Sequence, residues 1–92
     1  MKVSGAQVKA ARDLLKITQA ELAEATGIAE RTVRKFEGDG ILEPGNLEKL
    51  LAELERRGIE FTNGTGIGVR LHFEKAAEFA RSAASARNQS AR

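Results

Sequence analysis

The fold of this chain is decided by residues 18–37, which read TQAELAEATGIAERTVRKFE. Two short stretches with a helical spacing of apolar residues meet at Gly27, with almost no linker between them. If the chain turns sharply at Gly27, the apolar side chains of both stretches face one core. These side chains are Leu22, Ala23, Ile28, Val33 and Phe36. The stretch therefore predicts two short helices joined by a tight turn, a helix-turn-helix.

Capping signals set the first two helix starts. Ser4 is followed three residues later by a glutamine, and Thr18 by a glutamate, which is the spacing of a capping box. These signals predict helices over about residues 5–15 and 19–25. Gly27 is expected to end the second helix in the left-handed conformation.

Two further helices are expected. The first covers about residues 29–37 and is stopped by the turn cluster 38–40. The second follows Asn46 as its N-cap and runs to about Arg57. Its apolar stripe consists of Leu47, Leu50, Leu51 and Leu54.

Beyond Gly58 the periodicity changes to alternation. Residues 59–61 and 69–73 alternate as strands do, and the glycine-rich stretch TNGTGIG lies between them. Two strands alone are marginal in water, so this hairpin must pack on the helices or pair with a second chain. From Glu74 an Ala-rich helix is expected to about Ser85, followed by fraying or disorder.

The expected fold class is therefore mainly α, with a four-helix domain, a β extension and an Ala-rich C-terminal helix or tail. The corresponding divisions are residues 1–57, 58–73 and 74–92. The length of 92 residues allows one small core and no substrate cleft between two domains. The sequence contains no Cys, which excludes disulfides and thiolate metal sites and fits a reducing compartment. No apolar run is long enough to span a bilayer, so a cytoplasmic location and no membrane partner are expected.

Charge is distributed unevenly along the chain. Residues 1–73 contain eleven Lys or Arg and eleven Asp or Glu, whereas residues 74–92 contain four and two, which gives the net charge of +2. Any affinity for nucleic acid must therefore come from local clusters of cations. One such cluster is on the outer face of the third expected helix, where Arg31, Arg34 and Lys35 accompany Glu30.

Several short motifs in residues 8–54 resemble the lambda-repressor-like, Cro/cI-type (xenobiotic-response-element) helix-turn-helix family. They are an Arg in the first helix, Thr-Gln opening the second, Glu-Leu-Ala within it, Gly-Ile at the turn, Thr-Val in the third and Phe-Glu-Gly closing it. The resemblance implies a transcriptional regulator that binds double-stranded DNA with its third helix in the major groove. We expect a repressor of bacterial or phage type that binds a palindromic operator as a homodimer.

The resemblance also implies roles for individual residues. Base contacts are expected from Glu30, Arg31 and Arg34, because arginine fits guanine and glutamate can accept a hydrogen bond from cytosine. Phosphate contacts are expected from Lys16, Gln19, Thr32 and Lys35. An ion pair between Arg12 and Glu37 is expected to join the first helix to the end of the third. Two features depart from the family: Ala29 stands where a capping hydroxyl is usual, and Glu30 places a carboxylate near the DNA.

The strands after Gly58 supply more apolar surface than an isolated hairpin requires, which makes them the expected dimer interface. The residues concerned are Ile59, Phe61, Ile67, Val69, Leu71 and Phe73. Two alternatives remain open. The chain could be the antitoxin of a toxin-antitoxin pair that regulates its own promoter, or an adaptor or antiactivator that binds a regulatory protein through the same scaffold.

No catalytic constellation is apparent. The Gly64-x-Gly66-x-Gly68 pattern is not followed directly by a helix, so a hairpin turn explains it better than a nucleotide site. His72 is the only histidine, and one imidazole assembles neither a metal site nor a nucleophilic triad. We expect no enzyme activity, no metal and no cofactor.

Overall fold

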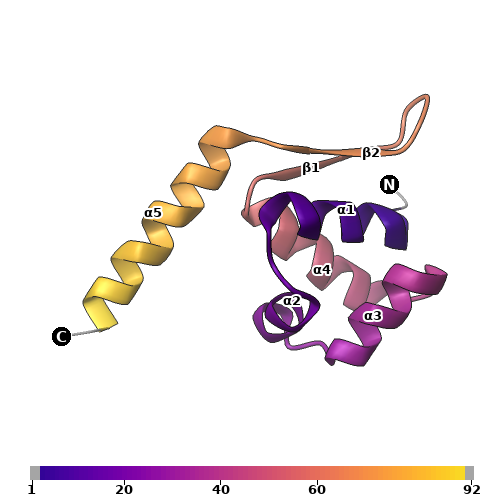
Figure 1. The fold of residues 1–92 in the computed structure, drawn as a ribbon, viewed down its shortest axis with the longest axis horizontal. Helices are drawn as coiled ribbons and strands as arrows, with labels where there is room; N and C mark the ends of the chain where they lie inside the picture. Colours follow the sequence, from indigo (N-terminus) through magenta and orange to yellow (C-terminus); the bar gives the residue numbers. More distant parts are fainter. Residues whose placement is uncertain (1–2, 91–92) are drawn as a thin grey trace.

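The computed structural model describes residues 3–90, with side chains described as far as Ser85. Within this range the elements follow in the order α1 (Gly5–Leu15), α2 (Gln19–Thr26), α3 (Glu30–Asp39), α4 (Pro44–Arg56), β1 (Ile59–Thr62), β2 (Gly68–Leu71) and α5 (Phe73–Ser90) (Figure 1). Helices α1 to α4 gather into one body, the two strands lie along its upper side, and α5 runs away from it. The fold is mainly helical with a small antiparallel hairpin, as the sequence predicts.

The core lies between the four helices of the body. Its fully buried large side chains come from every one of them, because each helix turns one apolar stripe inward. They are Phe36, Leu22, Leu50, Leu54, Val8 and Val33. Ile28, directly after the turn, is also buried, so the turn between α2 and α3 is anchored in the same core.

The first two helix starts are as predicted. Ser4 and Thr18 each accept a hydrogen bond from the third residue of the helix, whose side chain binds the cap in return. Gly27 ends α2 with φ at 76°, in the left-handed region that glycine tolerates best.

Two predicted boundaries are wrong. Helix α3 continues through Gly38 to Asp39 and ends at Gly40, which takes the left-handed conformation (φ 73°). Helix α4 starts at Pro44 rather than after Asn46, because proline at the first helical position already has a helical φ and needs no N–H partner. Asn46 is therefore inside the first turn of α4 and is not its cap.

The hairpin packs on the body along α1 and α4. Ile59 is opposite Leu71 and Phe61 opposite Val69, so four apolar side chains share the face turned toward the helices. Gln7 of α1 fixes this arrangement. Its side-chain amide is within 3.1 Å of Thr62 O, 3.0 Å of Gly68 O and 3.0 Å of Asn63 Oδ1, while its own oxygen accepts from Ser4 N.

The last helix is longer than predicted. Phe73, expected at the end of a strand, is the first residue of α5, and the helix continues past Ser85 to Ser90. Alanine is the best helix former, and the stretch has no proline or glycine to stop it. Fraying or disorder is expected beyond about Ser85; residues 86–90 instead belong to α5, and residues 91–92 lie outside the described range.

None of the helices within residues 3–90 is long and apolar enough to cross a membrane.

Candidate nucleic-acid interface

Helix α3 presents one apolar and one charged face. Val33 and Phe36 point into the core and are almost fully buried, which fixes the rotation of the helix about its axis. The opposite face therefore turns Arg31, Arg34 and Lys35 into solvent. The N-cap residue Ala29 makes no side-chain cap, so the first N–H groups of α3 are without that partner.

Two of the three exposed cations of α3 have carboxylate partners on the same helix. Arg34 Nη2 is 3.1 Å from Glu30 Oε2, and Lys35 Nζ is 3.1 Å from Asp39 Oδ2, both at the favourable i,i+4 spacing. Asp39 also accepts a hydrogen bond from Ile41 N, and this bond together with Lys35 lowers the pKa of its carboxyl group. Such exposed pairs are weak and exchange easily for a phosphate.

Arg31 is different. Among the residues that the structure describes, no ion pair or hydrogen bond of its side chain is found. Its guanidinium group keeps five donors in a planar fork, the geometry that fits the O6 and N7 atoms of guanine. Of the three residues expected to contact bases, Arg31 is therefore the one that needs no rearrangement.

A buried ion pair connects α1 to the end of α3. Arg12 Nε is 2.9 Å from Glu37 Oε2 and Arg12 Nη2 is 3.1 Å from Glu37 Oε1, with only 13% and 3% of the two side chains exposed. Arg12 also donates to Ile17 O at 3.0 Å. Hydrogen bonding to Glu37 raises the pKa of Arg12. The pair is therefore a buried link between α1 and α3 and does not face outward. We call this Arg12–Glu37 ion pair the brace.

Gln19 belongs to the same network. Its Nε2 donates to Glu37 Oε1 at 3.0 Å, so the ion pair holds the amide of the first residue of α2 in one orientation. A side-chain amide has two N–H groups, which leaves a second donor for a phosphate oxygen. The sequence analysis does not predict this link between Gln19 and the ion pair, because the family resemblance implies only the Arg12–Glu37 pair and a local pattern does not show a contact across 18 positions.

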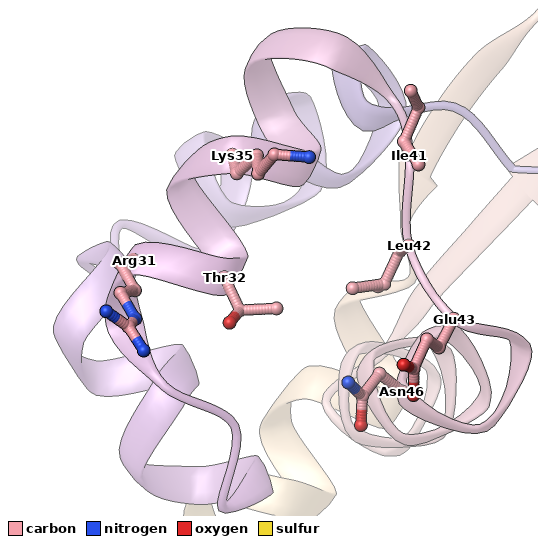
Figure 2. A pocket seen from close by; sticks show the side chains of 7 residues that line it. All are labelled: Arg31, Thr32, Lys35, Ile41, Leu42, Glu43 and Asn46. Atoms are coloured by element: carbon pink, nitrogen blue, oxygen red, sulfur yellow. The ribbon is translucent and has the colours of Figure 1, made fainter.

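The other residues expected to contact phosphate are at the edges of α3. Lys35 and Thr32 line a hollow of about 460 Å³ between α3 and the start of α4, together with Arg31 and Asn46 (Figure 2). Thr32 and Leu42 point into this hollow from its two sides. Lys16 lies elsewhere, at the C-terminal end of α1, where it is exposed and has a left-handed backbone (φ 57°). The structure thus places Thr32 and Lys35 beside Arg31 around one hollow, whereas Lys16 lies apart from them at the end of α1.

Asn46 is a lining residue that the sequence interpretation missed. The sequence predicts a helix cap at this position, whereas the residue lines the hollow from the first turn of α4. The signal available in the sequence was Pro44, which marks the first helical position and so removes Asn46 from the cap.

The predicted dimer surface needs a correction. Ile59 and Phe61 are 3% and 5% exposed and belong to the core of the single chain, because β1 lies directly over α4. Val69 and Leu71 are half-buried against the same core. Of the six predicted residues, only Ile67 and Phe73 are largely exposed, at 64% and 83%.

No group of three or more potential metal ligands is found in the described part of the chain. His72 pairs with Glu60 across the hairpin at 2.5 Å, and this contact lowers the pKa of the Glu60 carboxyl group.

The tight turn at Gly27, the buried brace behind it and the charged outer face of α3 define a helix-turn-helix protein of the DNA-binding class. Comparison with family models gives the same result, since the helix-turn-helix model of the Cro/C1 type matches residues 8–61. This match covers more than half of the 92 residues, and the chain belongs to that family of DNA-binding transcription regulators. A search among curated proteins finds no significant match.

Proposed function

We propose that this protein is a sequence-specific repressor that binds a palindromic operator as a homodimer. The observation that carries the proposal is the outer face of α3, where Arg31 has no side-chain partner among the residues that the structure describes and Arg34 and Lys35 have only exchangeable ones. A repressor needs no surface beyond such a DNA-binding face, because occupation of a promoter is enough to block transcription.

The proposed dimer follows from the small size of this face. One helix in the major groove reads only a few base pairs, and each mismatch costs about 1–3 kcal/mol of discrimination. Two copies related by two-fold symmetry read two half-sites about 34 Å apart, which multiplies the specificity.

The electrostatics of α3 favour specific over nonspecific binding. Glu30 and Asp39 neutralise Arg34 and Lys35 when DNA is absent, so the face attracts phosphates only weakly from a distance. In a complex, Glu30 can keep Arg34 extended toward a base, or accept a hydrogen bond from cytosine itself.

Selection from random double-stranded oligonucleotides tests the proposal. The expected product is a two-fold symmetric sequence that the protein retards in a gel. Arg31→Ala should weaken binding to this sequence by about tenfold to a hundredfold, the equivalent of one bidentate guanine contact. Arg70→Ala is the matched control, because Arg70 is also an exposed arginine, on the outer side of β2.

Two results would overturn the proposal. If no sequence is enriched, the chain is not a sequence-specific DNA binder. If Arg31→Ala abolishes DNA retardation but leaves regulation in cells intact, the scaffold acts by binding another protein, as an adaptor would.

A further inference from the structure

As far as Ser85, the side chains of α5 that are not fully exposed lie along one face of the helix, at Ala76, Phe79 and Ala83. Its start packs against Gly58, whose O accepts from His72 N at 2.8 Å. Nearly two turns later, the Phe79 ring is 4.8 Å from the guanidinium carbon of Arg56 and 4.7 Å from that of Arg57. Beyond this contact α5 diverges from the helical body (Figure 1).

A second face of α5 is exposed and apolar. It begins with Phe73, whose side chain is the most exposed of the large apolar residues at 83%, and continues through Ala77, Ala80 and Ala84. The steps of four, three and four residues place all four side chains along one seam, as at the core positions of a coiled coil. The seam is roughly 130° around the helix from Phe79, more than a third of a turn, so the contact with the arginines leaves it uncovered.

The length and exposure of α5 call for further packing. Helices in water gain most of their stability from burial of an apolar face rather than from intrinsic propensity. Phe73, at the start of this face, is 83% exposed, so it buries little apolar surface in the single chain.

The charges beside the seam identify what can cover it. Glu74 and Arg81 flank the seam on the same side and are one heptad apart. When two copies of α5 pair antiparallel, Glu74 of each lies beside Arg81 of the other, and the two contacts are related by symmetry. A parallel pair would bring Glu74 level with Glu74 of the second copy and leave both without this cation.

The sizes of the side chains along the seam favour the same antiparallel orientation. The antiparallel register that joins Glu74 to Arg81 also places the large Phe73 opposite the small Ala84, and Ala77 opposite Ala80. The antiparallel arrangement also sets the two helix dipoles in the favourable direction.

We propose that α5 is the dimerisation helix of this protein and pairs antiparallel with α5 of a second copy through the seam from Phe73 to Ala84. The inference rests on the homodimer of the proposed function and moves its interface from the hairpin to α5. The alternative interface would use Ile67, the remaining exposed large apolar residue of the hairpin.

Charge reversal tests the pairing in the full-length chain by sedimentation equilibrium. Glu74→Arg and Arg81→Glu should each weaken the dimer at least tenfold, because each creates two like-charge contacts. The double variant should regain the wild-type dissociation constant, since it only exchanges the two partners. Glu78→Arg is the control reversal on the side of α5 away from the seam, and it should leave the dimer unchanged.

Cysteine crosslinking tests the relative orientation of the two α5 helices. The sequence contains no Cys, so only the introduced cysteines can form disulfides. A mixture of the Ala77→Cys and Ala80→Cys variants should form the mixed disulfide faster than either variant forms its own. Ser82→Cys, on the opposite side of α5, should not crosslink. Disulfides between two copies of the Ala77→Cys variant alone would show a parallel pair and overturn the proposed register.

The proposal fails if the wild type is monomeric, if the double charge variant does not recover, or if Ile67→Ser alone dissociates the dimer. These outcomes are separable from failure of DNA binding. A monomer that retards its selected sequence leaves the DNA-binding proposal standing, and a dimer that enriches no sequence leaves the α5 pairing standing.

Discussion

Removal of Arg12 should destabilise this protein far more than loss of a surface ion pair would. The carboxylate of Glu37 is 3% exposed and receives two hydrogen bonds from Arg12, so Arg12→Ala leaves it buried without a cation. Breaking one side of a buried pair costs about 3–5 kcal/mol. A domain of this size has a free energy of unfolding of about 5–15 kcal/mol, so the variant should lose a large part of it.

The double variant Arg12→Met with Glu37→Met separates the cost of the orphaned charge from the value of the pair. Apolar side chains of similar volume often replace a buried ion pair at no net cost. We therefore expect the double variant to unfold in urea within about 1–2 kcal/mol of the wild type, although Arg12→Ala is strongly destabilised. The measurement is a set of urea titrations followed by circular dichroism, with Arg70→Ala as an exposed control.

The same Arg12 and Glu37 variants also report on DNA binding. In the double variant Gln19 loses Glu37 as acceptor, so its amide is no longer held in one orientation. Affinity for DNA should then fall by a similar factor for all sequences, because a phosphate contact carries no sequence information. The reasoning is refuted if Arg12→Ala costs less than about 1 kcal/mol, since such a value is typical of a solvated pair.

Three further predictions concern packing and pH. Gly5→Ala should destabilise the protein by about 1–3 kcal/mol, because the added Cβ would be 2.0 Å from Phe36 O; Gly45→Ala, where a Cβ meets nothing within 4 Å, should not lower the melting temperature. Gln7→Ala leaves partly buried hairpin oxygens without their donor, at about 1–3 kcal/mol each when water cannot replace it. Faster amide exchange in the hairpin with unchanged exchange in α3 would show that the effect is local. Hydrogen bonds from the N–H and hydroxyl of Thr18 lower the pKa of Glu21, so the capping box stabilises the fold above the unfolded-state pKa of Glu21 and is lost as the pH falls through the lower folded value. An NMR titration should find the Glu21 midpoint below that of an ordinary glutamate, and Thr18→Ala should raise it; an unshifted midpoint in the wild type would contradict the assignment.

The features of the fold that the sequence predicts correctly depend on residues only a few positions apart. The capping spacings after Ser4 and Thr18 and the glycine at position 27 act over three or four residues, so α1 and α2 could be placed to within about one residue. The end of α3 was misplaced because glycine at position 38 is only weakly unfavourable in a helix, and tertiary packing overrides a preference of that size.

The sequence pattern within one helix or strand does not show which other element, or which second copy, covers its apolar side. The alternation of residues 59–61 shows that one side of β1 is apolar, but the same pattern fits burial against the helices and burial against a second copy. The structure shows burial against α4, which takes Ile59 and Phe61 out of the predicted interface.

By itself, the sequence determined the helix-turn-helix, its caps and the charged composition of α3, because these depend on spacings within one or two helical turns. Only the tertiary structure decided which charges are free: Arg34 and Lys35 have partners, Gln19 is tied to the buried brace, and Arg31 is left to the solvent. The tertiary structure also decided that Phe73 is the first residue of α5 and not the end of a strand, and that its side chain is exposed. Those outcomes depend on how elements distant in sequence pack against one another, since packing determines which side chains are still exposed.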